Sequence, residues 1–355
     1  MNRTWSGLAA VVLSAVVMAV VIDRLAAHIA PPVNRREVQD GVRDLRNSNP
    51  DVLVLGSSHA RTFHEVGQQL AARTSNGTVL VDVPVENGKL VAYEWVLRHR
   101  LVPLIEERDE NGSLRRDRLR RFVLLTEWWD SCAPTTSSKL PYTYWNLPSR
   151  AWTFGDFLSS VWQDGLNGYN RNYLQNRLRR WLAESALIYD RTQGVLMWRA
   201  IDWLHGKPPG RSPEEKRVQD EGWQQMVERG NQCIKDPQQM AALEHIVDYA
   251  LQRGLDVTVV LFPRKPITIT QTALNTTIHN YELAVRDLLE PRGVRVLDMT
   301  LTSPLTDADF MDDNDHVNAE GNRKFARWAL DRDLQFLFER GDAIQASGTV
   351  SGAGR

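Results

Sequence analysis

The sequence predicts an α/β protein whose core is a parallel sheet of five strands with helices on both faces. Two observations lead to this class. Five short segments consist largely of β-branched residues and leucine, as expected for strands that are covered on both sides. Longer segments with helical patterning separate most of these runs. This alternation indicates a doubly wound sheet.

The predicted elements follow one another along the chain. We expect strands at Val52–Leu55, Val79–Val83, Phe122–Thr126, Val257–Phe262 and Val294–Leu297. We expect helices at His59–Arg73, Leu90–Glu107, Gln238–Gln252 and Thr277–Leu289. In such sheets ligands bind beyond the carboxyl ends of the strands, so the segments that follow the strands are the places to search for a site.

The N-terminal segment 5–22 carries no charged residue over 18 positions. At about 1.5 Å per residue in a helix, this length just spans the hydrocarbon core of a bilayer. A cleaved signal peptide is the alternative, since Arg3 precedes the segment and Ala27-His28-Ile29-Ala30 follows it as an imperfect small-residue cleavage site. We predict an uncleaved transmembrane anchor over residues 1–23. The arginines on either side of it do not fix its orientation.

The remaining chain divides into segments of different composition. Residues 24–50 are polar and contain Pro31-Pro32, which predicts a stalk. The catalytic domain is expected at 51–127 and 236–340, with a helical insertion or cap at 128–235 and a disordered tail at 341–355. The insertion holds nine of the chain's 12 tryptophans. These rings either bury one another in a helical subdomain or face the sugar rings of a carbohydrate.

Composition excludes some classes of function. The formal net charge of −1 over 355 residues gives no reason to expect a nucleic-acid partner. The sequence has no zinc-like Cys/His spacing and no glycine-rich phosphate loop, so we expect no metal and no cofactor. Cys132 and Cys233 either form a disulfide or stay separate buried thiols.

Two short motifs, far apart in the sequence, predict the chemistry. Gly56-Ser57-Ser58-His59 directly follows the first strand, at a strand-to-helix turn that exposes a nucleophile. Asp313-Asn314-Asp315-His316 supplies a histidine with a carboxylate three residues before it. A serine needs an adjacent base, and the base needs a group that orients it. We therefore predict a triad of Ser58, His316 and Asp313, with Asp312 or Asp315 as alternatives to Asp313.

These motifs resemble the first and last conserved blocks of the SGNH (GDSL-like) hydrolase superfamily. Ser57 stands where that family usually has an acid, and Val317-Asn318-Ala319-Glu320-Gly321 is similar to the family's continuation into its last helix. The resemblance covers about residues 50–110 and 255–338. It implies an SGNH/flavodoxin-like sheet and a covalent acyl-serine intermediate.

The resemblance also implies an oxyanion hole. Its donors would be the backbone N–H of Ser58 and the N–H of Gly88, since Asn87-Gly88 is similar to the family's second block. The chain departs from the pattern after the third strand, where Glu127-Trp128-Trp129 offers no asparagine. Asn87 is a candidate for the missing donor, although Asn-Gly is also an ordinary turn.

Other residues near the strand ends are candidates for substrate binding. His59 follows the nucleophile and either lines the pocket or faces solvent at the start of the helix. Trp128 and Trp129 follow the third strand into the predicted site. Arg264 and Lys265 follow the fourth strand, where they either bind an anionic group such as a uronate carboxylate or lie in a solvated loop.

The resemblance, together with the predicted anchor, implies a membrane-anchored SGNH-like serine acyltransferase, in particular an O-acetyltransferase that acts on a cell-envelope or exported polysaccharide. The alternatives are a carbohydrate O-acetylesterase and a non-catalytic polysaccharide-binding subunit of an export complex. The resemblance to anchored members implies a membrane-bound O-acyltransferase as partner. It also implies an inner-membrane location, with the catalytic domain in the periplasm.

Overall fold

The computed structural model describes residues 33–74, 77–85, 88–131, 212–229, 236–311 and 316–338, together with positions 14, 17, 18, 21 and 162. The chain separates into two compact units. One comprises residues 40–135 and 211–355 and contains the sheet, and the other comprises 1–39 and 136–210. The strands and the helices that connect them all belong to the sheet-containing unit.

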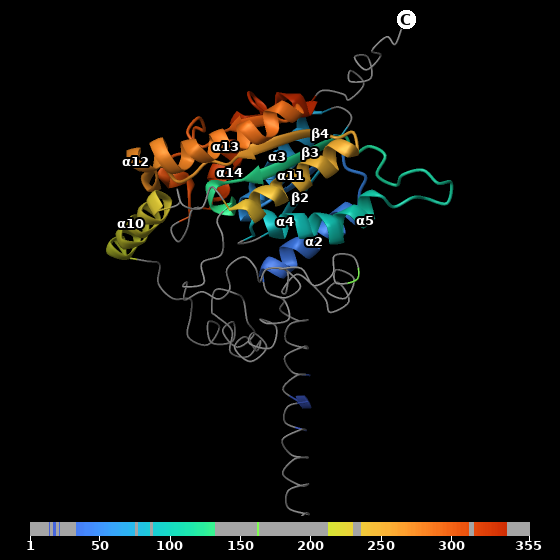
Figure 1. Ribbon diagram of the computed structural model, residues 1–355, viewed down its shortest axis with the longest axis horizontal. Coiled ribbons are helices and arrows are strands. Elements are labelled where there is room, and N and C mark those ends of the chain that lie inside the picture. The colour runs from blue at the N-terminus through green and yellow to red at the C-terminus, as the bar shows by residue number, and fades with distance from the viewer. Residues whose placement is uncertain are drawn as a thin grey trace, which may run out of the picture. The chain divides into compact units, whose positions relative to one another are not determined.

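The sheet has five strands, all parallel, in the order β2-β1-β3-β4-β5 (Figure 1). The strands are β1 (Val52–Gly56), β2 (Leu80–Pro84), β3 (Arg121–Thr126), β4 (Asp256–Leu261) and β5 (Arg295–Asp298). All five predicted strands are confirmed to within one or two residues at each end. The apolar runs located them because β1 and β3 are buried along their whole length.

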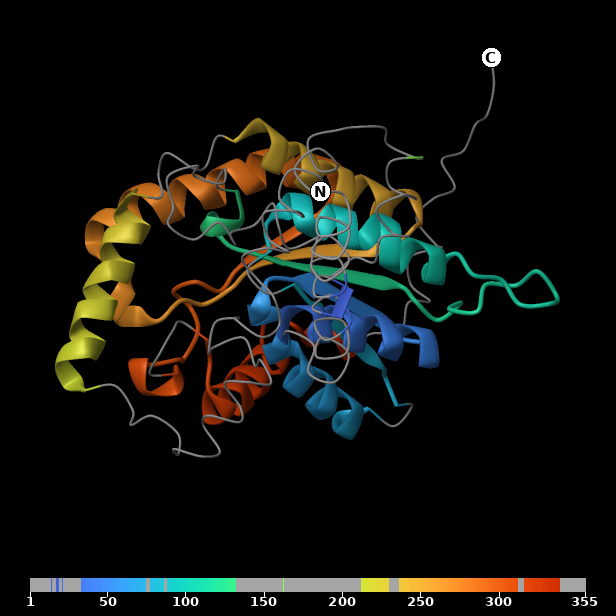
Figure 2. The same cartoon turned by 90° about the horizontal axis from the view of Figure 1, so that it is seen from below.

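Helices cover both faces of the sheet (Figure 2). One face presents Val52, Val54 and Val123 to a core that includes Phe63 of α3 (Thr62–Arg73) and Phe325 of α14 (Ala319–Leu330). Successive strand residues point to opposite faces. The alternate residues therefore point to the other face. In Figure 2 this face is covered by α4 (Leu90–Val96, cyan), α11 (Pro237–Gln252, gold) and α13 (His279–Leu289, orange).

The four predicted helices are confirmed, and the structure adds helical segments whose positions were not predicted, among them α12 (Gln271–Ala273). On the N-terminal side they are the 3-10 turn Ser58–Arg61, α3 (Thr62–Arg73), α4 (Leu90–Val96), a π turn (Leu97–Leu101), α5 (Val102–Ile105) and a 3-10 turn (Trp128–Ser131). On the C-terminal side they are α10 (Pro213–Arg229), α11 (Pro237–Gln252), α12 (Gln271–Ala273), a π turn (Leu274–Ile278), α13 (His279–Leu289) and α14 (Ala319–Leu330). Short 3-10 turns lie at Pro266–Thr268, Glu290–Arg292, Asp307–Asp309 and Gln335–Phe338.

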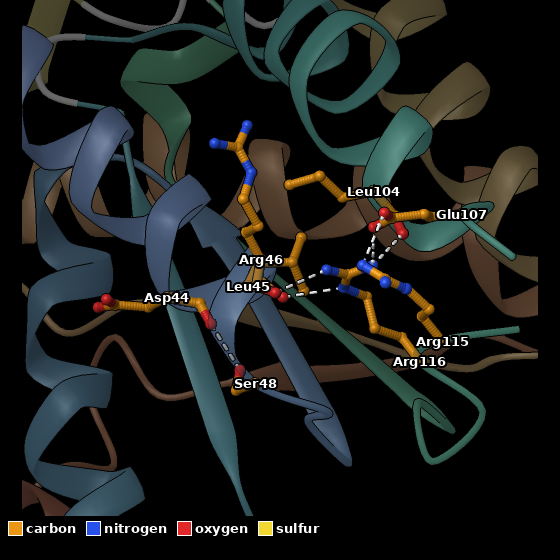
Figure 3. A network of polar contacts seen from close by, with 8 residues as sticks. All are labelled: Asp44, Leu45, Arg46, Ser48, Leu104, Glu107, Arg115 and Arg116. Carbon is orange, nitrogen blue, oxygen red and sulfur yellow. Dashed lines mark hydrogen bonds and ion pairs between the residues drawn. The ribbon is translucent and has the colours of Figure 1, made fainter. Parts of the chain in front are cut away.

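Residues 24–50 do not form the predicted stalk throughout, because Val33–Asn47 is a helix, α2. Val42 and Leu45 of α2 are buried. The guanidinium of Arg116 is buried too, and it donates to the carbonyls of Leu45 (2.8 Å), Arg46 (2.9 Å) and Leu104 (2.7 Å) (Figure 3). A cation at these carbonyls caps the last turns of α2 and α5. The polar composition of α2 thus reflects one exposed face and not a linker.

Several predictions fall largely or wholly outside the described residues. Within the predicted anchor 5–22 only Ser14, Val17, Met18 and Val21 are described, and all four are helical and exposed. Among the described residues no helix is long and apolar enough to cross a bilayer. The tail 341–355, both cysteines and most of the insertion are not described. Helix α10, which we assigned to the insertion, belongs to the unit that contains the sheet.

Candidate active site

Ser58 lies where the strand order of the sheet reverses. The connection that leaves β1 runs to β2 on one side, and the connection that leaves β3 runs to β4 on the other side, so the two diverge at the carboxyl ends of β1 and β3. Ligands of open α/β sheets bind at this kind of switch point. Ser58 begins the 3-10 turn after β1, and 8% of its surface is exposed.

The turn between β1 and α3 is fixed by the residues before Ser58. A Cβ on Gly56 would lie 2.6 Å from Cβ of Leu125, so only glycine fits beside β3 at this point. The hydroxyl of Ser57 accepts a hydrogen bond from the N–H of His59 at 3.3 Å, and the carbonyl of Ser57 accepts from Ala60 at 2.9 Å. Ser57 therefore caps the turn that presents Ser58.

The predicted contact between Ser58 and His316 is present. Nε2 of His316 lies 2.6 Å from Oγ of Ser58, although 258 residues separate them. This distance is within the range of O–H···N hydrogen bonds, so the pair has the geometry in which a histidine accepts a serine proton.

Backbone contacts hold the segment that carries His316. Its carbonyl accepts from the N–H of Met311 at 2.8 Å, and Val317 forms a β-bridge with Phe310. Asn318 caps α14 through Gly321 (2.9 Å), and its side-chain amide donates to the carbonyls of Ala308 (2.8 Å) and Phe310 (3.3 Å).

A buried carboxylate supports the same segment from the other side. Asp309 accepts from the backbone and hydroxyl of Thr306 and from Lys324 of α14 at 2.7 Å. Its carbonyl accepts from the N–H of Asn318 at 2.9 Å. A Cβ on Gly321 would lie 2.3 Å from the carbonyl oxygen of Asp309, so the start of α14 packs against this residue only with glycine there.

Four of the predicted site residues and their alternatives lie outside the described residues. These are Asp313, its alternatives Asp312 and Asp315, and the oxyanion candidate Asn87. The identity of the group that orients His316 therefore stays a prediction.

Gly88 lies in a tight turn after β2. Its N–H donates to the carbonyl of Val85 at 2.8 Å, and a Cβ would lie 2.5 Å from the ring of Tyr93. Packing thus requires the glycine, and its N–H is used within the turn. The oxyanion role that the resemblance implies would need that hydrogen bond to open. The N–H of Ser58 is better placed, because the first N–H groups of a helical turn have no partner inside it.

His59 is buried and contacts the catalytic candidates directly. Only 4% of its surface is exposed, which excludes the alternative of a solvent-facing helix start. Its ring packs edge-on against His316 (centroids 5.2 Å apart) and against Phe262 of the segment after β4 (5.0 Å). His59 therefore forms part of the wall behind His316.

The two tryptophans after β3 differ in environment. Trp128 is buried and its ring centroid lies 5.8 Å from the guanidinium carbon of Arg264, while Trp129 is half-buried under the ammonium of Lys89 at 4.8 Å. The two rings meet edge-to-face at 5.4 Å. Such cation–π contacts favour cations over the ring faces.

Sequence reasoning missed the buried charges in this region. Glu127 and Arg264 form a buried ion pair, and Asp130 and Lys89 are buried nearby. Burial and the neighbouring Glu127 hold the pKa of Asp130 well above its usual range. Burial lowers the pKa of Lys89 to about 7, against the opposing effect of Asp130. The signal in the sequence that could have indicated these buried charges was the position of charged residues shortly after apolar strands.

Lys265, a predicted ligand-binding residue, forms an ion pair within the protein. Its ammonium pairs with Asp220 of α10 at 2.8 Å, and both side chains are largely buried. The pair links the segment after β4 to α10, so Lys265 has a structural contact that the sequence did not predict.

Comparison with known proteins adds no assignment. No protein-family model matches the chain, and no curated protein is significantly similar to it.

Proposed function

We propose that this protein is a membrane-anchored serine acyl-transfer enzyme of the SGNH-like type, and in particular an O-acetyltransferase for a cell-envelope or exported polysaccharide. The observation that carries the proposal is the 2.6 Å contact between Ser58 and His316 at the switch point of the sheet. The strand order 2-1-3-4-5 is the flavodoxin-like order, which agrees with the SGNH resemblance.

The proposed reaction has two transfers. The hydroxyl oxygen of Ser58 attacks the acyl carbonyl of the donor while its proton moves to Nε2 of His316. The bond between the acyl carbon and the donor's leaving group breaks, and the leaving group takes the proton from His316. A sugar hydroxyl then gives its proton to His316 and attacks the acyl-Ser58, which releases the acylated sugar and restores the Ser58 hydroxyl.

The tetrahedral intermediates carry a negative oxygen that needs fixed donors. The N–H of Ser58 supplies one of them in this proposal. Asp313 orients His316. A further donor is either Asn87 or the N–H of Gly88, once its hydrogen bond to the carbonyl of Val85 has opened. With water in place of the sugar hydroxyl, the same steps give an esterase, and anchoring beside a membrane-bound O-acyltransferase favours transfer.

Ser58→Ala provides the direct test. We expect turnover of p-nitrophenyl acetate by the full-length protein to fall by about 10³-fold or more in this variant and in His316→Gln. Mass spectrometry of the wild type should show an acetyl group on the peptide that contains Ser58. The matched control is Ser57→Ala, which removes the neighbouring hydroxyl and only the cap of the turn, at a cost of about 1 kcal/mol in stability.

A non-catalytic polysaccharide-binding subunit is the second candidate. It is favoured by the N–H of Gly88, which donates within its turn, and by the lack of an asparagine after β3. Wild-type protein that binds glycans but shows no turnover and no acetylated Ser58 would support this candidate and contradict the enzyme.

A further inference from the structure

A second pocket lies at the carboxyl ends of β4 and β5, in the same sheet-containing unit. Its volume is about 210 Å³. Its polar lining comes from Arg264, Thr270, Gln271, Thr300 and Ser303, and the rest of its wall is aliphatic. Drug-sized ligands occupy about 300–1,000 Å³, so this pocket suits a single ring and not an extended chain.

The charges around the pocket are balanced. Arg264 is 4% exposed and forms an ion pair with Glu127, which is 9% exposed. The neighbouring cation, Lys265, pairs with Asp220. A binding site for an anion presents a cation that the protein has not already neutralised. Both cations that follow β4 have carboxylate partners, so the pocket favours a neutral ligand.

The remaining polar groups are hydroxyls and an amide. Thr270, Thr300, Ser303 and Gln271 each combine donor and acceptor capacity, which matches a ligand with several hydroxyl groups. Trp223 of α10 lies close by, with its ring 5.9 Å from the guanidinium carbon of Arg264. The hydroxyl of Thr270 already donates to Glu228 at 2.8 Å and accepts from the N–H of Ala273 at 3.1 Å, and the amide of Gln271 donates to Asn275 at 3.0 Å. These groups keep further hydrogen-bonding capacity, which a hydroxylated ring would use and an aliphatic acyl chain would not.

The pocket is connected to the Ser58 region through packed side chains. A smaller neighbouring cavity shares Arg264 and Thr300 with it and is also lined by Phe262. The ring of Phe262 contacts His59, and His59 contacts His316. The pocket and the Ser58–His316 pair therefore lie along one edge of the sheet.

We infer that this pocket binds one neutral, polyhydroxylated ring, namely a sugar unit of the acceptor glycan next to the unit that is acylated. The identification of the ligand as the acceptor rests on the proposed function. The ability of the pocket to bind such a ring is a separate property that is measured without catalysis.

Ser303→Trp tests the inference, because the indole would fill the pocket. Thr302→Trp is the matched control, since Thr302 is the adjacent residue, is exposed and does not line the pocket. Binding of xylohexaose, cellohexaose and a hexauronate is measured by calorimetry with the full-length protein in detergent. We expect a neutral hexaose to bind, Ser303→Trp to raise its Kd at least 10-fold, and Thr302→Trp to change it less than twofold.

Turnover of p-nitrophenyl acetate separates this inference from the proposed function. We expect Thr302→Trp to keep wild-type turnover, because Thr302 lies outside the pocket. If the wild type shows no turnover but Ser303→Trp still raises the Kd of the hexaose, the proposed function is overturned and the pocket assignment stands. An unchanged Kd in Ser303→Trp, no binding of any neutral hexaose, or binding of the hexauronate alone would overturn the pocket assignment.

A second variant covers the case in which Ser303→Trp does not fold. Gln271 is exposed at the rim and its amide bonds Asn275, so Gln271→Ala leaves the core intact. We expect it to weaken neutral hexaose binding about 3- to 10-fold. An unchanged Kd in a folded Gln271→Ala, with Ser303→Trp unfolded, would count against the inference.

Discussion

The contact between Ser58 and His316 depends on neighbouring residues that take no part in the proposed reaction. Ser57 caps the turn before α3, and Asp309 joins the segment of His316 to α14 through Lys324 and Asn318. A side chain displaced by about 1 Å can lose much of its catalytic effect. The short distance between the pair therefore reflects these supporting contacts as much as the pair itself.

Asp309→Asn should show how much the supporting contacts contribute. Burial raises the pKa of Asp309, but the hydrogen bonds from Lys324 and Thr306 outweigh it and hold the pKa below its usual range. A carboxylate with a lowered pKa contributes stability that is fully present above its unfolded pKa of about 3.9, and that is lost as the pH falls through the lower folded value. We expect the variant to be about 1–3 kcal/mol less stable at neutral pH.

Urea unfolding from pH 7 down to pH 2.5 measures this effect. The difference between wild type and Asp309→Asn should shrink as the pH falls below about 3.9. Asp287→Asn, an exposed carboxylate on α13, is the control and should change stability by less than about 0.5 kcal/mol. A difference that is constant with pH would show that the charge of Asp309 contributes nothing to stability.

The sequence predicted that Ser58 and His316 lie together, but it did not predict the buried charges in the same region. Ser58 and His316 belong to local motifs whose positions after a strand and before a helix can be recognised. Glu127 and Arg264 are adjacent in space only because β3 pairs with β4 in the sheet. No local pattern encodes that proximity, so the ion pair of Glu127 with Arg264 could not be predicted.

Among the elements, the strands were the most predictable and α2 the least. Parallel strands covered on both faces are continuous apolar runs, as in Val52–Leu55. Helix α2 has a mostly polar sequence and follows two prolines, which suggested a stalk. Its signal was the spacing of Val38, Val42 and Leu45, which places three apolar side chains on one helical face.

Arg116→Met should reveal how firmly α2 is attached. The guanidinium donates to three carbonyls and to Glu107 at 2.8 Å, and its side chain is 2% exposed. Methionine keeps much of the volume but leaves the carbonyls of Leu45 and Leu104 without this donor. We expect a loss of about 2–4 kcal/mol in the free energy of unfolding, measured with urea.

Arg115→Met is the matched control for this change. Arg115 is the adjacent residue and also pairs with Glu107, at 3.0 Å, but its side chain is 56% exposed. Exposed ion pairs contribute about 0–1 kcal/mol. Equal losses in the two variants would mean that the carbonyl contacts of Arg116 add no stability.

For the molecule as a whole, two N-terminal truncations should distinguish the contribution of the predicted anchor to membrane attachment from the contribution of α2 to stability. A protein that begins at residue 24 lacks the apolar segment and keeps α2, whereas one that begins at residue 49 lacks both. We expect the first to leave the membrane fraction and to melt within about 2 °C of the wild type. The second should melt about 8–16 °C lower, because it loses the buried face of α2 and the partners of Arg116, worth about 4 kcal/mol.

Fractionation and thermal melting check both expectations. A protein that begins at residue 24 and still sediments with membranes would contradict the anchor. If the protein that begins at residue 49 melts with the wild type, α2 is dispensable for the sheet.

The distance between Ser58 and His316 along the chain sets the time at which the pair can form. Ribosomes add about 5–20 residues per second, so the base emerges some tens of seconds after the nucleophile. Until then β1 and α3 have no β5 or α14 to complete their packing, and Ser58 has no partner to take its proton. In the proposed function, a nascent or interrupted chain therefore carries a serine that lacks its base, and reactivity toward acyl donors arises only in the finished protein.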